Sequence, residues 1–254
     1  MNGRVRASAV AGMFYPSDPN ELQKQIDGFL AAANPPKGTS PKAIIVPHAG
    51  TIYSGPIAAT AYATLRPEGI SRVVLLGPSH HVFFHGLAAS SADAWRTPLG
   101  DVPIEWTADT PVNDAAHELE HSLEVQLPFL QTVLGEFKLV PLVVGDAEKE
   151  EVSDRLAALW GGPETLVVVS SDLSHYERYE QACAKDKIIS QAIVDLDMRG
   201  LEPDSACGLI PIKGLIHLAQ QKGLRAEMLD LRNSGDTAGS RDQVVGYGAY
   251  AFYE

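Results

Sequence analysis

Histidine follows three apolar runs that have the character of buried strands. The runs are 43–46, 73–76 and 166–169, and the loops after them carry His48, His80 and His175. In open α/β sheets, ligands bind beyond the carboxyl ends of the strands. A lone histidine at such a place is usually only a hydrogen-bonded loop residue. Because imidazole is the commonest metal ligand and acid/base group near neutral pH, three such loops with Gly, Pro and Ser turns predict a shared functional site.

Cys207 is a candidate ligand of a second kind. It lies just ahead of a predicted helix whose first turn suits Pro211. A thiol at a helix N-terminus has a lowered pKa, which favours the thiolate that binds metals. The alternative is a buried structural cysteine, the commoner fate of a single cysteine, and the histidine loops favour the ligand. Cys183, inside another predicted helix, is interpreted as a core residue.

The segment from His117 to His121 matches the H-E-x-x-H pattern of zinc proteases. In that pattern both histidines lie on one helix face and the glutamate acts as base, and Glu124 could add a third ligand. However, Glu120 places a second charge where such helices usually pack apolar residues. The pattern also leaves the strand-end histidines unexplained, so a zinc hydrolase built on His117 and His121 is the minor alternative.

The elements that must position these residues alternate along the chain. Apolar runs at 43–46, 73–76, 139–144 and 166–169 predict buried strands, and 244–252 predicts a last strand. Helices are predicted from about residue 17–20 and over 56–65, 114–134, 147–160, 179–198 and 211–222. This alternation predicts one α/β domain over residues 1–254, with a mostly parallel central sheet flanked by helices.

Composition excludes several classes of function. The chain has 254 residues, 45% of them hydrophobic, and a formal net charge of -12, which argues against binding a nucleic-acid backbone. Two cysteines are too few for a disulfide framework and fit a reducing compartment. No apolar run is long enough to span a membrane, and the N-terminus lacks the apolar core of a signal peptide. A cytoplasmic protein is expected.

Several ordered motifs together closely resemble the Memo family, whose bacterial and archaeal members are often called AmmeMemoRadiSam system protein B. The resemblance covers essentially the whole chain. The motifs are Val46-Pro47-His48-Ala49-Gly50, Leu76-Gly77-Pro78-Ser79-His80-His81, His121-Ser122-Leu123-Glu124, Ser170-Ser171-Asp172-Leu173-Ser174-His175 and Cys207-Gly208, with 11–16 and 247–249 at the two ends.

The resemblance implies a fold similar to the class III extradiol dioxygenases, non-haem iron enzymes that open catechol rings. The two histidines and one cysteine of the family's metal position map onto His48, His80 and Cys207. Further pocket residues of the family map onto His121, Asp172 and His175. The aromatic pair Phe14 and Tyr15 is expected near the mouth of the pocket. His81, beside a candidate ligand, and Glu124 are expected to support the pocket.

The function expected from this resemblance is that of a metal-dependent redox protein, with Fe(II) as the first choice and Cu or Zn as alternatives. In this hypothesis His175 acts as general acid or base, Asp172 orients it by accepting a hydrogen bond, and His121 hydrogen-bonds oxygen or substrate, steadied by Glu124. A thiolate in place of the dioxygenase carboxylate departs from that pattern, because it is softer and can itself be oxidised.

The main alternative is a metal- or peptide-binding module without turnover. The expected partner is a small aromatic substrate or a peptide. The resemblance also suggests a functional link to a radical S-adenosylmethionine protein and an AMMECR-like protein.

Overall fold

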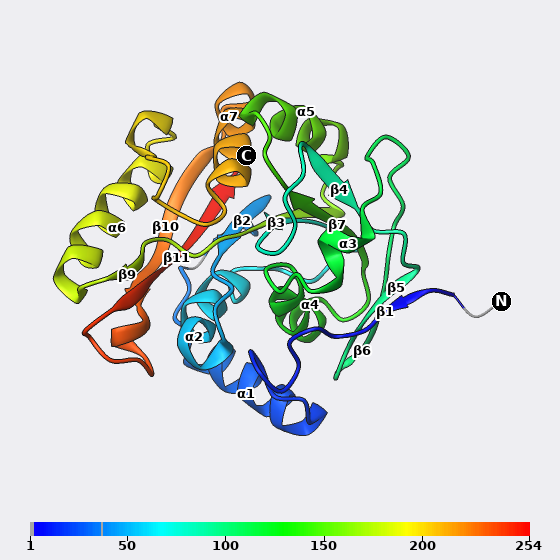
Figure 1. Ribbon diagram of the computed structural model, residues 1–254, viewed down its shortest axis with the longest axis horizontal. Coiled ribbons are helices and arrows are strands. Elements are labelled where there is room, and N and C mark those ends of the chain that lie inside the picture. The colour runs from blue at the N-terminus through cyan, green and yellow to red at the C-terminus, as the bar shows by residue number, and fades with distance from the viewer. Residues whose placement is uncertain (1–2, 37) are drawn as a thin grey trace.

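The computed structural model describes residues 3–36 and 38–254, and a twisted sheet runs through its centre (Figure 1). The strand order is β10-β11-β2-β8-β3-β7-β4. The inner strands β2, β8, β3 and β7 run parallel, whereas β4, β10 and β11 join antiparallel, so the predicted parallel character holds for the centre of the sheet. The bounds are β2 (Ala43–Val46), β3 (Arg72–Pro78), β4 (Leu87–Ala89), β7 (Lys138–Val144), β8 (Thr165–Ser170), β10 (Arg225–Asn233) and β11 (Val244–Tyr253).

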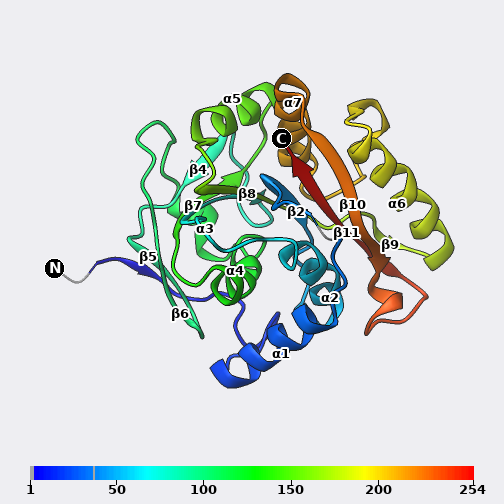
Figure 2. The same cartoon turned by 180° about the vertical axis from the view of Figure 1, so that it is seen from behind.

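The inner strands are continuously apolar because both of their faces are buried. Along β2, Ile44 and Val46 belong to one hydrophobic core and Ala43 and Ile45 to the other. Helices α1, α2 and α4 cover the first core, and α5, α6 and α7 cover the second, on opposite sides of the sheet in Figures 1 and 2. These helices are α1 (Pro19–Ala32), α2 (Thr51–Tyr62), α4 (Leu127–Leu134), α5 (Lys149–Leu159), α6 (Tyr179–Val194) and α7 (Leu209–Lys222).

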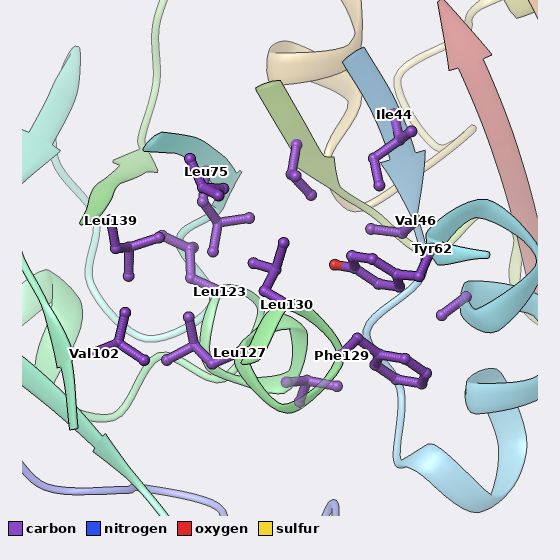
Figure 3. Packing of buried hydrophobic residues seen from close by; sticks show 14 of the residues in the cluster. Ile44, Val46, Tyr62, Leu75, Val102, Leu123, Leu127, Phe129, Leu130 and Leu139 are labelled. Atoms are coloured by element: carbon purple, nitrogen blue, oxygen red, sulfur yellow. The ribbon is translucent and has the colours of Figure 1, made fainter. Parts of the chain in front are cut away.

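Aromatic packing closes the first core between α2 and α4. The rings of Tyr62 and Phe129 stack with centroids 5.0 Å apart and planes 7° from parallel (Figure 3). The buried Tyr62 hydroxyl donates to the side-chain oxygen of Gln126 at 2.8 Å, so its polar end is satisfied. This contact fixes α4 and the short turn before it beneath the histidine loops.

A second, smaller sheet ties down the N-terminal segment. Its order is β1-β5-β6, with β1 (Val5–Arg6) parallel to β5 (Ala94–Thr97) and β5 antiparallel to β6 (Gly100–Pro103). Strand β9 (His175–Glu177) pairs with β11 beyond the end of β8. The chain leaving β8 therefore turns along the last strand before it enters α6.

The predicted strands 43–46, 73–76, 139–144, 166–169 and 244–252 all lie within observed strands, whereas two helix predictions need correction. The range 114–134 is broken into α3 (Asp114–Glu118), a turn of 3-10 helix over Glu124–Gln126, and α4. The break occurs because the Glu120 carboxylate accepts the backbone N–H of Ser122 at 2.9 Å, which competes with helical hydrogen bonding. Helix α2 also begins at Thr51, five residues earlier than predicted.

Several further features differ from the sequence prediction, which contains none of the short strands β1, β4, β5, β6 and β9. Strand β10 was not predicted, because its polar and apolar residues are mixed on an edge that is only half buried. Cys183 lies on the exposed side of α6 and not in the core. Within the described ranges, each helix is too short or too polar to cross a lipid bilayer.

Candidate metal centre

The histidine-bearing loops lie side by side because β2, β8 and β3 are parallel neighbours in that order. This arrangement was predicted from the strand pattern. The potential ligand atoms of His48, His80 and Cys207 all lie within 4.8 Å of one another, and His48 Nε2 is 3.3 Å from Cys207 Sγ. Cys207 reaches the two imidazoles from the loop that precedes α7. Two nitrogens and one sulfur thus converge in a group that could hold a metal ion.

The tautomer of His48 is fixed by a buried hydrogen-bond network. The hydroxyl of Ser170 donates its proton to the backbone oxygen of Ser122 at 2.6 Å. The same hydroxyl accepts from Gln126 Nε2 at 2.8 Å, and the Gln126 amide is oriented by its second N–H, which donates to Pro47 O. Since the only hydroxyl proton is used, the Ser170 oxygen must accept from His48 Nδ1, 2.9 Å away.

This network leaves a lone pair on His48 Nε2, which faces the Cys207 sulfur. Burial, followed by the neighbouring His80 and His121 rings, lowers the pKa of His48 well below its ordinary value. The ring is therefore neutral near pH 7. A neutral imidazole with one nitrogen hydrogen-bonded and the other free is the form that binds metals.

Replacing Ser170 with alanine is expected to weaken metal binding roughly 10- to 100-fold, because the partner that orients His48 is lost. The unpaired buried groups should also lower the free energy of unfolding by about 1–3 kcal/mol. Cobalt(II) titration and urea unfolding measure the two effects. Ser153→Ala is the matched control, since Ser153 is equally buried and its hydroxyl has no partner in the described residues. Equal metal affinity and equal stability of the two variants would contradict the role of Ser170 in orienting His48.

His80 is held from behind by Glu120. The fully buried carboxylate accepts from His80 Nδ1 at 2.8 Å and from the His80 backbone N–H at 2.6 Å. Burial raises the pKa of Glu120, but the hydrogen bonds from His80 and Ser122 outweigh it and hold the pKa below its ordinary range. A carboxylate that fixes one ring nitrogen leaves the other, here Nε2, available to a metal.

Sequence reasoning missed the role of Glu120. Its position between two histidines was interpreted only as an objection to the zinc-protease helix. A signal was nevertheless present, since a charged residue at an expected apolar position must find a partner if it is buried. That partner, His80, lies 40 residues away in the sequence.

His121 lies against the rings of His48 and His80. Its ring centroid is 4.5 Å from that of His80, 5.4 Å from His48 and 4.7 Å from Phe14. Burial, followed by the neighbouring His80, lowers the pKa of His121 to about 4. His121 is therefore a neutral hydrogen-bonding group near pH 7. The more exposed His81 lies further out, 6.2 Å from His121 between ring centroids.

The thiol of Cys207 differs from expectation. Its sulfur accepts the backbone N–H of Asp172 at 3.3 Å, yet burial and the Asp172 carboxylate raise its pKa to about 12. The predicted lowering is wrong for the protein without a metal, because burial and the Asp172 carboxylate outweigh the hydrogen bonds from Asp172, Ser171 and Gly208 that favour the thiolate. A bound cation reverses this balance and removes the proton from a coordinating thiol.

The raised pKa of Cys207 gives metal binding a defined pH dependence. The thiol carries its proton at neutral pH, and a metal ion must displace it. Between pH 6 and 8 we therefore expect the association constant to rise about tenfold per pH unit and to fall as pH falls. Titration of the protein with Zn²⁺ at several pH values measures the slope. An affinity independent of pH would show that the thiolate is already formed.

Asp172 does not have the expected role of orienting His175. Its carboxylate accepts the backbone N–H groups of His48, at 2.7 Å, and of Ala49, at 3.3 Å. Asp172 thus ties the loop after β8 to the loop after β2, and burial raises its pKa to about 7. His175 lies at the exposed edge of the site, on β9, and burial followed by the nearby charges lowers its pKa.

The expectation that Tyr15 lies with Phe14 near the mouth of the pocket is wrong, because its side chain is buried against Glu124. The Tyr15 hydroxyl donates to Glu124 at 2.6 Å, and both side chains are buried. The expectation that Glu124 steadies His121 is wrong, because its carboxylate is engaged by the N-terminal segment. The zinc-protease pair is also wrong. His117 Nε2 donates to Ala88 O at 3.0 Å, and in the described residues His117 belongs to neither cluster of side chains that could hold a metal ion.

A groove of about 850 Å³ opens beside the ligands. His80, His81 and Cys207 line it together with a largely apolar wall. That wall includes Val82, Phe83, Phe84, Leu209, Ile210 and Pro211. A molecule in this groove would lie next to two of the three potential metal ligands.

Known proteins resemble this chain along nearly its whole length. Residues 6–251 match the model of a family described as Memo-like protein. A MEMO1 family protein of Aquifex aeolicus is 40% identical over 96% of this chain and 97% of its own. A MEMO1 family protein of Sulfolobus acidocaldarius is 37% identical over 96% of this chain and 97% of its own. One of Methanopyrus kandleri is also 37% identical, over 97% of this chain and 98% of its own. The matched range includes every loop that contributes to the site.

Proposed function

The chain belongs to the family of Memo-like proteins, and from that premise we propose that it is a metal-dependent redox enzyme. The observation that carries the proposal is the convergence of His48 Nε2, His80 and Cys207 Sγ beside a groove that His80 and Cys207 line. The hydrogen bonds behind both histidines support it, because they hold each ring in the form that binds a metal.

The donor set favours a transition metal. Two imidazoles and a thiolate suit iron, copper or zinc and are poor ligands for Mg²⁺ or Ca²⁺, which prefer oxygen. We propose Fe(II), with copper and zinc as alternatives. When bound, a redox-active metal supplies the electron transfer to oxygen that amino-acid side chains lack.

The remaining groups would bind and orient the substrate. The apolar wall of the groove, with Phe83 and Phe84, suits a small aromatic molecule. His121, neutral and next to both ligand histidines, would hydrogen-bond a substrate hydroxyl. His175, at the exposed edge, would accept a proton from it, since a positioned imidazole suits proton transfer near neutral pH.

Oxygen consumption tests this proposal. Protein purified without oxygen and loaded with Fe(II) should consume oxygen when given a catechol or related phenol. Cys207→Ala and His48→Ala should abolish the uptake, whereas Cys183→Ala, which changes the exposed cysteine on α6, should leave it unchanged. Uptake no faster than that of free Fe(II), across a broad phenol panel, would overturn the proposed activity.

A second candidate is a metal-binding module without turnover. The specific observation that favours it is the thiolate donor, which an oxidising metal centre could itself oxidise. In that case the same protein would bind a metal tightly, with the pH dependence given above, and consume no oxygen with any substrate of the panel.

A further inference from the structure

Arg6 makes a buried contact with the backbone behind the metal ligands. Its Nε donates to the carbonyl of His117 and its Nη2 to that of Glu120, both at 2.7 Å. Its Nη1 donates to the Glu124 carboxylate at 2.6 Å, and the two side chains are 8% and 0% exposed. One guanidinium therefore holds three points of the chain between residues 117 and 124.

That stretch of backbone depends on outside donors. Residues 119–123 lie between α3 and the next helical turn, so their carbonyl groups do not all have helical partners. Glu120 and His121 are in this break. The Arg6 guanidinium suits the position, because its planar fork of N–H groups can serve several acceptors at once.

Glu124 receives further groups of the N-terminal segment. Its carboxylate accepts the backbone N–H groups of Ala9 and Val10, at 2.8 Å and 3.0 Å, as well as the Tyr15 hydroxyl. The segment 5–15 is thus fixed to the 117–124 loop at both of its ends. Figure 1 shows it running from β1 past α4 to α1.

The same segment also contacts the loop that carries His48. The carbonyl of Phe14 accepts the backbone N–H of Thr51 at 2.7 Å and its hydroxyl at 3.1 Å. Thr51 is the first residue of α2, directly after the His48 loop. Since the Phe14 ring packs on His121, the N-terminal segment bridges the two loops that hold the histidines.

We propose that Arg6 is a positioning residue for the metal ligands. By holding the carbonyl of Glu120, it keeps the Glu120 carboxylate behind His80 Nδ1 and so keeps His80 Nε2 turned toward Cys207. This inference rests on the proposed metal site, and it adds a residue that contacts none of the three proposed ligands, His48, His80 and Cys207. It predicts that loss of Arg6 changes the state of the His80 ring as well as the stability of the fold.

The test compares Arg6→Ala, Arg6→Lys and Arg4→Ala. Arg4 is the matched control, because it lies two residues away and pairs with Asp114 at the surface. Zn²⁺ affinity is one readout. The other is the ¹⁵N spectrum of the histidine rings in the metal-free protein, which reports the tautomer and hydrogen bonding of His80 Nδ1.

We expect Arg6→Ala to weaken Zn²⁺ binding about 10- to 100-fold and to release the His80 Nδ1–H from its fixed hydrogen bond. Arg6→Lys should recover part of the stability through Glu124 but not the affinity, because an ammonium group cannot replace the planar guanidinium fork at both carbonyls and Glu124. Arg4→Ala should behave as the unsubstituted protein.

Folded Arg6→Lys protein with unchanged affinity and an unchanged His80 spectrum would overturn the inference, even if Arg6→Ala fails to fold. If the unsubstituted protein binds no Zn²⁺, Co²⁺ or Fe²⁺, the proposed metal site fails instead. The His80 spectrum still decides the role of Arg6 in that case.

Discussion

Replacing Cys207 with alanine is expected to weaken metal binding about 1000-fold. Apparent binding free energies of structural zinc sites are on the order of 12 kcal/mol, and one of three protein ligands accounts for roughly a third of that. A loss of about 4 kcal/mol corresponds to roughly three powers of ten in affinity. Competition with a chromophoric chelator measures the change directly.

The fold of the Cys207→Ala protein should persist. The sulfur accepts one backbone N–H, from Asp172, so its loss should cost about 1 kcal/mol of stability. Cys183→Ala is the control and should bind metal normally. If Cys207→Ala also kept its affinity, the ion would lie elsewhere, and the group formed by His80, Glu120 and His121 would be the next candidate.

Replacing Glu124 with alanine is expected to lower the free energy of unfolding by about 3–5 kcal/mol. Its carboxylate is fully buried and pairs with Arg6, so the substitution leaves a buried cation without its partner. Two backbone N–H groups and the Tyr15 hydroxyl lose their acceptor as well. Urea unfolding followed by circular dichroism gives the difference.

The control for Glu124 is Glu118→Ala. Glu118 belongs to the same stretch of chain but is exposed, so its replacement should change stability by no more than about 0.5 kcal/mol. A double-mutant cycle with Arg6 isolates the pair, and a coupling energy near zero would contradict the buried interaction. The free energy of unfolding of Glu124→Gln, which keeps one acceptor oxygen, should lie between those of Glu124→Ala and Glu118→Ala.

The sequence predicts the centre of the sheet well, for a physical reason. Strands buried on both faces must be apolar throughout, so β2, β3, β7 and β8 stand out as short runs. Parallel neighbours then place their carboxyl ends together. This is why the sequence predicts His48 and His80 at one edge of the sheet. Cys207 is a candidate because it precedes a predicted helix, and the family resemblance points to it as well.

The supporting groups could not be predicted in the same way. Glu120 acts on His80 across 40 residues, and Arg6 acts on Glu124 across 118. The spacing of residues within one segment does not reveal contacts between distant segments. It predicted an unbroken helix over 114–134, which the structure breaks where Glu120 contacts His80. The prediction of a lowered Cys207 pKa was wrong for a similar reason. The sequence shows that a helix follows Cys207, but it does not show that the thiol is buried.

The longest of these contacts also bears on biosynthesis. His48 and Cys207 meet across 159 residues, and contacts of that span form only after much chain entropy has been lost. A growing polypeptide lacks its sulfur donor until most of the chain has left the ribosome. A metal ion that needs all three donors would therefore bind only after most of the chain has been synthesised and folded. It would stabilise the folded protein by mass action and would not stabilise shorter nascent chains.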